Sequence, residues 1–362
     1  MARQQPQAYA WPSLLHRQEA PLRLVYLDLN HWISLAKAAT GHRDGDRRKG
    51  ALEAVRDVSS AGTALFPLSA THYMEMSGIQ DPRQRADIAD VMEELSGFTT
   101  LINRTILMRY EIEAALDEML GSASTRLDPL PLCGRGVGPA FGVHGGLRIK
   151  SKDGRDVTDS ARSSWLQGPE AFDAWLSEAE RQFERGILRG PSDADVPVLN
   201  LRGWDPRVAR VGAKKRVEQE IELSARLDAE PQWRRGRLRD VVSGRYVAIE
   251  LLDLLNETIT DRKLVTADIF ASREAARRFA DSMPSADVHI TLTTAAHRNR
   301  DKQWEPNDIF DIDALSSAVP YCDAVVTERH ACHVLQSTKM PAKTGTKIMA
   351  RLQDLVSWLD SM

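Results

Sequence analysis

The feature that most constrains the fold of this chain is an apolar run that ends in an acid and leads straight into a helix. Residues 22–27 read Leu-Arg-Leu-Val-Tyr-Leu, and Asp28 follows them directly. A short apolar run of this kind is typical of a buried strand. Asn30 can cap a helix over residues 31–39, which carry apolar side chains at roughly helical spacing. The sequence therefore predicts a strand, an acid and a helix in that order.

A second strand and helix follow, with a further acid. Residues 49–59 predict a helix, and residues 63–68, Thr-Ala-Leu-Phe-Pro-Leu, predict a strand. Ser69 or Thr71 can cap the next helix, which contains Glu75. Alternation of strand and helix is the pattern of βαβ units, so the sequence predicts a parallel sheet.

The last hundred residues return to the same alternation. Val-His-Ile-Thr-Leu at 288–292 predicts a strand that brings the chain back to the sheet. The elements expected after it are a helix at about 308–319, a strand at 324–326, a helix at about 328–335, a strand at 347–349 and a helix at 352–359. The acids at or near the ends of these elements are Asp311, Asp313, Asp323 and Glu328.

The stretch between these two parts consists of long charged amphipathic segments, and we interpret it as a mainly helical insertion. A glycine-rich stretch at 133–146 interrupts it. We interpret that stretch as a plain loop, because a phosphate-binding loop should leave a strand and open a helix. The expected class is α/β, a parallel-sheet core flanked by helices. The expected parts are a loose leader at 1–21, core at 22–80, the helical insertion at 81–262, and core with a C-terminal helix at 263–362.

Composition narrows the compartment and the class of protein. A formal net charge of -3 excludes the global basic excess of a nucleic-acid coat, although a local basic patch can still bind phosphates. The three cysteines lack metal-finger spacing and fit reduced thiols. The first twenty residues have no apolar signal core, and no stretch approaches the length of a membrane span. We therefore expect a cytoplasmic protein with no membrane partner.

The acids predict a shared site although they are far apart in the sequence. The carboxyl ends of parallel strands meet at one edge of a sheet, so side chains that follow different strands can converge there. Hard divalent cations are held by carboxylate oxygens, and such cations activate water and stabilise charge in phosphodiester hydrolysis. Several carboxylates at one sheet edge therefore predict a divalent-metal site.

This arrangement resembles the PIN-domain (PilT N-terminus) family of metal-dependent ribonucleases. The resemblance is carried by Val-Tyr-Leu-Asp-Leu-Asn at 25–30, Leu-Ser-Ala-Thr at 68–71 leading to Glu75, Asp-Ile-Asp-Ala-Leu-Ser-Ser-Ala at 311–318, and Ala-Val-Val-Thr at 324–327. It covers roughly residues 22–78 and 288–348 and leaves the helical middle unexplained. The resemblance implies a PIN-like core and hydrolysis of RNA phosphodiesters with Mg²⁺ or Mn²⁺.

The resemblance also implies which acids are catalytic and hold metal. Asp28 and Glu75 match the family's first two acids directly, and the third is Asp311 or Asp313. Positions three, four and seven after Asp311 are apolar, so Asp311 begins the helix face that packs toward the sheet edge. The same positions after Asp313 are Ser, Ser and Pro, a polar face. We therefore favour Asp311 and keep Asp313 as the alternative.

The fourth acid departs from the family's pattern. Where the family has an aspartate two residues after the threonine, this chain has Arg329. Glu328 or Asp323 can take its place. Asp323 starts its strand and would lie at the opposite edge, unless a bend near Pro320 brings it round. The second metal position therefore stays open.

Other residues can support the site or contact a nucleic acid. Asn30, Thr71 and Thr327 are supporting candidates, because an amide or hydroxyl beside a strand-end aspartate can orient water or a ligating oxygen; Thr71 can instead only cap its helix. Basic residues that could hold an RNA backbone are Arg43, Arg47, Arg48, Lys49, Lys214, Lys215, Arg216, Arg234 and Arg235. Acids lie among several of them, so a solvated charged surface is the alternative.

The expected function is that of a PIN-like metal-dependent endoribonuclease. The large insertion favours a selective RNA substrate or a regulatory protein partner, as in a toxin or a defence-system effector. One alternative is a catalytically silent PIN-like module that binds protein or RNA. Another is a DNA nuclease on the same fold. The sequence does not give the oligomeric state.

Overall fold

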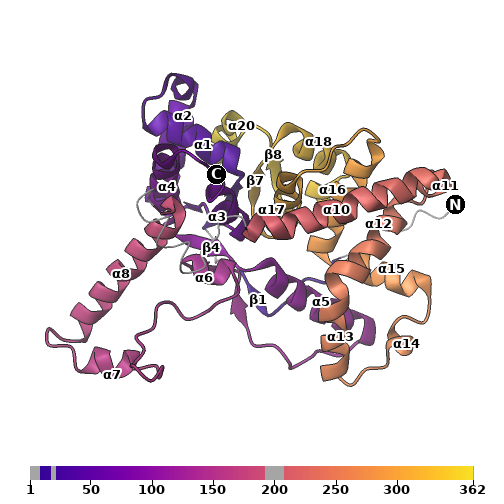
Figure 1. The fold of residues 1–362 in the computed structure, drawn as a ribbon, viewed down its shortest axis with the longest axis horizontal. Coiled ribbons are helices and arrows are strands. Elements are labelled where there is room, and N and C mark those ends of the chain that lie inside the picture. The colour runs from indigo at the N-terminus through magenta and orange to yellow at the C-terminus, as the bar shows by residue number, and fades with distance from the viewer. Residues whose placement is uncertain (1–8, 18–21, 192–207, 362) are drawn as a thin grey trace.

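A four-stranded, all-parallel sheet forms the centre of the molecule, in the order β3-β2-β7-β8 (Figure 1). The computed structural model describes residues 9–17, 22–191 and 208–361. The four strands are β2 (Arg23–Leu27), β3 (Ala64–Leu65), β7 (Ala324–Val326) and β8 (Lys347–Met349). Two strands come from the first part of the chain and two from the last, so the architecture is α/β with helices around small parallel sheets. Within the described ranges, no helix is long and apolar enough to cross a membrane.

One face of the sheet packs against helices from the first part of the chain and against the last helix. Val25 and Leu27 of β2 lie in this core, together with Ala324 and Val326 of β7. The covering helices are α1 (Leu29–Ala39), α2 (Lys49–Ser60), α4 (Pro82–Ser96) and α20 (Leu352–Leu359). Trp32 of α1 is fully buried there.

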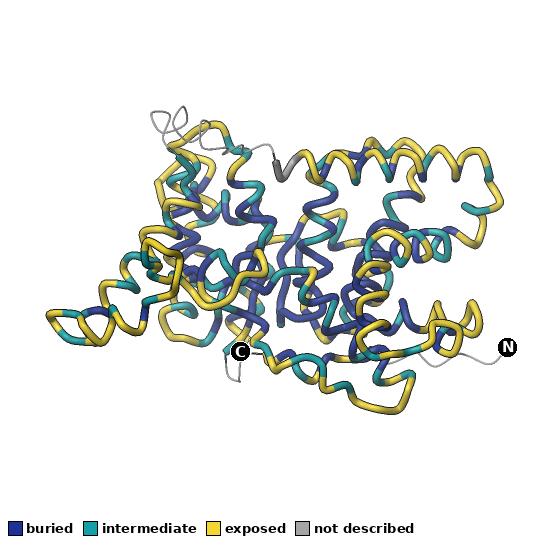
Figure 2. The backbone as a smooth tube through the Cα atoms, turned by 60° about the horizontal axis from the view of Figure 1, so that its bottom comes forward, coloured by how far each residue is buried: buried dark blue, intermediate teal, exposed yellow. Residues whose placement is uncertain are grey.

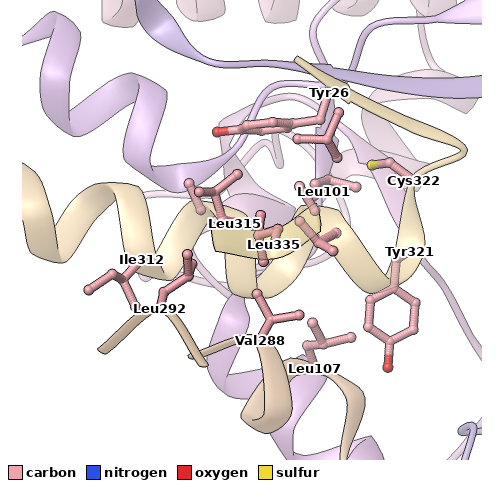
Figure 3. Close-up of a cluster of buried hydrophobic side chains, with 14 of the residues drawn as sticks. Tyr26, Leu101, Leu107, Val288, Leu292, Ile312, Leu315, Tyr321, Cys322 and Leu335 are labelled. Carbon is pink, nitrogen blue, oxygen red and sulfur yellow. The ribbon is translucent and has the colours of Figure 1, made fainter. Parts of the chain in front are cut away.

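The opposite face packs against helices from the last part of the chain. Leu24 and Tyr26 of β2 and Val325 of β7 lie in this second core, part of which Figure 3 shows. The helices that complete it include α16 (Pro284–Arg298), α17 (Pro306–Tyr321) and α18 (Arg329–Ser337). Because both faces are buried, the strands are continuous apolar runs rather than alternating ones.

The middle of the described chain is mainly helical and has a core of its own. Its longer helices include α5 (Arg104–Leu120), α8 (Pro169–Arg189), α10 (Val208–Ala229), α12 (Leu238–Tyr246), α13 (Leu252–Asp261) and α15 (Arg273–Ser282). Its shorter elements are β4 (Thr99–Leu101), β5 (Leu130–Pro131), β6 (Cys133–Arg135), α6 (Val137–Ala140), α7 (Thr158–Ser163), α11 (Pro231–Arg234) and the π-helical turn η2 (Val247–Leu251). The short helix α14 (Thr266–Ile269) lies between α13 and α15, and the elements outside the middle are β1 (Leu15–His16), η1 (Arg43–Arg48), α3 (Ala70–Met76) and α19 (Met340–Thr344).

The helical middle and the sheet share α16. Ala286 and Ile290 of this helix lie in the core of the helical middle, whereas Val288 and Leu292 lie in the second core, under the sheet. Figure 2 shows the buried segments gathered at the centre of the molecule and the exposed ones along its projecting arms. The most extended arm in Figure 1 is α8 with α7. The middle is thus packed into the same body as the sheet.

The strand expected at 288–292 is wrong, because these residues lie inside α16. Pro284 occupies the first turn and Asp287 adds a negative charge there, and both favour a helix start. The β-branched residues that resemble a strand are tolerated because the helix is buried on both sides, against two cores. Tertiary packing overrides the local propensity here.

Two further expectations differ from the structure. Of the expected leader, residues 1–8 and 18–21 lie outside the described residues, but residues 9–17 pack on the body. Tyr9 donates a hydrogen bond to Asp287 at 2.6 Å, and β1 pairs with β5. The glycine-rich stretch does leave a strand, β6, and open a helix, α6. The amide of Val137 at the start of α6 already donates to the Glu184 carboxylate, at 2.8 Å.

Asp313 of α17 lies in a buried ion-pair cluster, not on the polar face expected for it. Its carboxylate pairs with Arg216 of α10 and, at 3.5 Å, with Arg104 of α5. Glu250 pairs with the same two arginines, at 3.1 and 3.3 Å. Burial alone raises the pKa of Asp313, but the two guanidinium groups outweigh burial and hold the pKa below its usual value. This cluster joins α17 to the helical middle.

Replacing Asp313 by alanine should destabilise the protein, because two partly buried arginines would lose a counter-charge. We expect a loss of about 2–4 kcal/mol in the free energy of unfolding, measured by urea denaturation. Asp354→Ala is the control, since Asp354 pairs with Arg351 at the exposed surface and should cost far less. Equal losses for the two variants would contradict the structural role of the cluster.

Candidate functional site

The sheet has a topological switch point between β2 and β7. From β2 the chain moves outward to β3 on one side, whereas from β7 it moves outward to β8 on the other. In open parallel sheets, ligands bind outside the carboxyl ends of the strands at such a point. Asp28 directly follows β2, and Thr327 and Glu328 directly follow β7. The amide of Asp28 donates to the carbonyl of Val326 at 3.0 Å, which joins the two strand ends.

Asp28 is fixed in place by both of its carboxylate oxygens. Oδ1 accepts a hydrogen bond from the amide of Leu29 at 2.7 Å, so Asp28 caps α1. Oδ2 accepts one from the hydroxyl of Thr327 at 3.1 Å. Burial raises the pKa of Asp28 to about 6, although these hydrogen bonds oppose the rise. Thr327, a supporting candidate, therefore orients the first acid.

Glu75 reaches the same place from α3. The ring of His72, one turn earlier, lies 2.9 Å from the carbonyl of Leu27, and its other nitrogen accepts from the amide of Ser69 at 3.0 Å. These contacts fix α3 against the end of β2. Burial is the largest cause that raises the pKa of Glu75, to about 9, and the charges of Asp311, Asp28 and Glu328 add to it.

Asp311 comes from α17, on the side of the helix opposite to the Asp313 cluster. Burial raises the pKa of Asp311 to about 8, and the negative charges of Asp28, Glu328 and Asp308 raise it further. Lys302 acts in the opposite direction, but it is engaged with Asp308 at 2.6 Å. Such mutual effects require carboxylates that lie close together. The structure thus brings Asp28, Glu75, Asp311 and Glu328 to one edge, and we refer to these four as the acid cluster.

Glu328 supplies the fourth carboxylate, at the start of α18. It is exposed, and its Oε1 accepts a hydrogen bond from the side-chain amide of Asn30 at 3.3 Å. Asn30, another supporting candidate, lies in the first turn of α1 and so connects the helix after β2 to the acid after β7. The sequence leaves Glu328 and Asp323 as alternatives for the fourth acid. The structure places Glu328 at the same edge as Asp28.

Three predicted site residues lie elsewhere. Asp323 starts β7, and its carboxylate accepts from the amide of Leu24 at 2.9 Å, at the opposite edge of the sheet. The bend that would bring Asp323 round to the site is not present. Asp313 belongs to the arginine cluster. The hydroxyl of Thr71 contacts that of Ser69 at 2.7 Å rather than an acid.

The predicted basic residues divide into exposed and engaged side chains. Arg43, Arg47, Lys49, Lys214, Lys215 and Arg235 are exposed, and Arg48 is half-buried. Arg216 binds Asp313, and Arg234 binds Asp228 at 2.8 Å. Lys49 contacts Asp46 at 2.8 Å. Burial lowers the pKa of His31 to about 4 and the charge of Arg48 adds to this, so Arg48 lies near His31, whose ring is 3.4 Å from the carbonyl of Thr327.

The acid cluster has the donor chemistry for Mg²⁺ or Mn²⁺. All four side chains present carboxylate oxygens, which are the ligands that hard divalent cations prefer. In the part of the chain that the structure describes, no three His, Cys, Asp or Glu side chains stand close enough to ligate one ion directly. Mg²⁺ commonly binds through one or two carboxylates and keeps several of its waters. A cation held in that way would need only one or two direct ligands from the cluster.

Sequence reasoning missed two sets of residues at this edge. His72 reads as an ordinary residue of a helix, and only its contact with Leu27 shows that it positions Glu75. Trp304 and Lys302, which line a cavity next to Asp311, lie between the elements that the sequence predicts at 288–292 and 308–319. Pro284 is a helix-start signal, and a helix predicted from it would have included Leu292, Ala295 and Ala296, which line the same cavity.

We compared the chain with protein families, curated proteins and solved structures, and none of them matches it. Function is therefore inferred from the residues of the site alone.

The raised pKa values make stability depend on pH. The folded protein holds protons on Glu75 and Asp311 up to about pH 9 and about pH 8, whereas the unfolded chain releases them near pH 4–5. The folded state therefore carries more protons between these limits, and its stability falls as pH rises through this window. In EDTA, Glu75→Gln should reduce this loss between pH 5.5 and 8.5 by about 1–3 kcal/mol.

Urea denaturation at several pH values measures this effect. Glu94→Gln is the matched control, because Glu94 lies at the surface and pairs with Arg56 at 2.6 Å. The control should keep the slope of the unmodified protein. Identical slopes for all three proteins would show that Glu75 is not held in a buried acid cluster.

Proposed function

We propose that this chain is a PIN-like metal-dependent endoribonuclease that hydrolyses RNA phosphodiester bonds. The observation that carries the proposal is the acid cluster at the switch point of the parallel sheet. Four carboxylates from four separate segments share one edge, and each of three has a raised pKa because of burial and of its neighbours' charges. Buried acids with raised pKa values, at the position where ligands bind in such sheets, support a functional role.

The chain's own residues would have distinct roles in this chemistry. When bound, divalent cations would activate a water molecule and stabilise negative charge on the phosphate. Asp28, Glu75, Asp311 and Glu328 would hold them. Thr327 and Asn30 keep two of these carboxylates in position through the contacts described above. Carboxylates have about four lone-pair positions, so each can accept these bonds and still bind a ligand.

Basic residues near the same edge could hold the RNA backbone. Arg43, Arg47 and Arg48 lie on η1, which packs beside α1, and Arg48 is near enough to His31 to affect its pKa. Cationic side chains on this side of the molecule would bind the phosphates that flank the cleaved bond. RNA binding should therefore weaken with salt.

A catalytically silent binding module is the second candidate function. Two observations favour it: no three acids of the described residues converge tightly, and Arg329 occupies the place of the family's usual fourth acid. This candidate retains the fold and the basic residues but lacks hydrolysis. The experiment below separates it from the nuclease.

Conservative replacement of the acids should abolish cleavage without unfolding the protein. Asp28→Asn keeps a good helix cap, and Glu75→Gln keeps the side-chain volume. We expect each to lower the rate of RNA cleavage at least ~100-fold. Asp323→Asn is the control, because it changes a carboxylate of the same sheet at the opposite edge and should retain the rate.

The assay uses labelled single-stranded and duplex RNA and the corresponding DNA, with Mn²⁺ or with EDTA. Cleavage of RNA that requires Mn²⁺ and is lost in the two acid variants supports the proposal. Cleavage that persists in both variants would overturn the assignment of the site. Binding of RNA without any cleavage would favour the silent module, and cleavage of DNA alone would favour a DNA nuclease.

Metal binding can be tested without any substrate. A cation that binds only the folded state stabilises it by about 2.7 kcal/mol at a concentration of 100 times its dissociation constant. Mn²⁺ should therefore raise the melting temperature of the unmodified protein in a thermal-shift assay. The increase should be much smaller for Asp311→Asn and unchanged for Asp323→Asn. Equal increases for all three proteins would place the bound metal elsewhere.

A further inference from the structure

A cavity of about 320 Å³ opens directly beside the acid cluster. Asp311, Thr327 and Glu328 form the side that it shares with the cluster. The remaining wall comes from α16, α17, α18 and the segment that connects α16 to α17. The volume lies at the lower end of the range of about 300–1,000 Å³ for small-molecule sites. A single nucleobase or nucleoside fits this size, whereas a base pair within a duplex does not.

Most of the cavity wall is apolar. Leu292 of α16 and Ile312 and Leu315 of α17 line it, and Figure 3 shows the same three side chains in the buried cluster under the sheet. Ala331 of α18 also lines the cavity, and a larger side chain at this position would occupy part of it. A flat, uncharged ring system is suited to such a wall.

Trp304 adds an aromatic ring to this wall. Its side chain is only 7% exposed, and its indole Nε1 is buried with no hydrogen-bond partner among the described residues. Aromatic side chains are common stacking partners of unpaired nucleobases.

Lys302 places a positive charge beside the same ring. Its Nζ lies 5.9 Å from the centre of the Trp304 ring and 2.6 Å from the carboxylate of Asp308. Both residues line the cavity. A phosphate next to a bound base could therefore interact with Lys302, while the acid cluster lies on the other side. The cavity thus combines an apolar slot, an aromatic ring and a cation beside the proposed cleavage site.

We propose that this cavity binds one unpaired base of a single-stranded RNA substrate and so selects where the strand is cut. The inference rests on the proposed nuclease function and names the part of the substrate that the site recognises. Proteins that read RNA by sequence commonly take bases out of the stack and place them against aromatic side chains. The base held here would place its neighbouring phosphodiester at the acid cluster. Duplex RNA would be a poor substrate because its bases cannot enter.

Binding of the base can be measured directly, in EDTA and without cleavage. The indole N–H of Trp304 gives a signal in a ¹H–¹⁵N NMR spectrum, identified as the signal that Trp304→Phe lacks. We expect at least one of adenosine, guanosine, cytidine and uridine to shift this signal. The signal of Trp175, which lies exposed on α8, should not move and is identified in the same way from Trp175→Phe. No shift with any of the four nucleosides would overturn the inference.

Cleavage rates provide the second test. Ala331→Leu should fill part of the cavity, and Trp304→Phe should reduce the aromatic surface of its wall. Each should lower kcat/KM on single-stranded RNA about 10- to 100-fold, as expected for the loss of one bound base. Trp304→Phe should also reduce the difference between RNAs that vary only in the base next to the cut. Unchanged rates and unchanged base preference in both folded variants would overturn the inference.

The two tests separate this inference from the proposed function. If the unmodified protein cleaves RNA but no nucleoside moves the Trp304 signal, the nuclease stands and the base site is wrong. If nucleosides move the signal but no RNA or DNA is cleaved, the cavity binds a base and the nuclease is wrong. Melting temperatures of all variants show that they are folded.

Discussion

The constraint on which the rest of the account depends is the burial of neighbouring carboxylates at one edge of the sheet. Elsewhere some buried acids of this chain are neutralised by arginine or lysine, whereas Glu111 and Glu184 accept hydrogen bonds from neutral donors and also have raised pKa values. Asp313 pairs with two arginines, and Asp287 pairs with Arg239 and Lys343, so that both keep a lowered pKa despite burial. At the edge of the sheet, Glu75 and Asp311 instead have raised pKa values. Among the described residues, Asp28, Glu75 and Asp311 are thus buried acids with raised pKa values and no arginine or lysine partner, and the proposed metal site rests on them.

The fold produces this edge by joining distant parts of the chain. The parallel pairing of β2 with β7 places Asp28 beside Thr327, and the hydrogen bond between them connects residues that are 299 positions apart. Helix α17 serves two purposes because residues two apart point to nearly opposite sides of a helix. Asp311 faces the strand ends, whereas Asp313 faces the arginines of the helical middle. The middle thus supports the helix that supplies an acid.

Part of this arrangement could be predicted from the sequence. Strong local signals gave the strands at 324–326 and 347–349, the last helix and the acid after the first strand, because apolar runs with polar limits are local features. Helical spacing favoured Asp311 over Asp313, and the structure places Asp311 in the cluster. Long-range contacts could not be foreseen. Neither the arginine partners of Asp313 nor the contact of His72 with Leu27 has a local signature.

The helix at 284–298 shows the limit most clearly. Its central residues alternate like a strand, and only burial on both sides makes the helix stable. The sequence predicts a strand at 288–292 in place of this helix. It therefore gives no indication of the cavity that the helix helps to form beside Asp311. Because Asp323 starts its strand, the sequence places it at the edge opposite to the site. Its contact with the amide of Leu24 holds it at that edge.

The most direct test of the central claim is an anomalous difference map from crystals of the protein grown or soaked with Mn²⁺. If the acid cluster receives a cation, the map will show a peak bounded by Asp28, Glu75, Asp311 and Glu328. The claim is contradicted if these four carboxylates lie apart in the crystal, or if Mn²⁺ binds only at other acids while this edge stays without a peak.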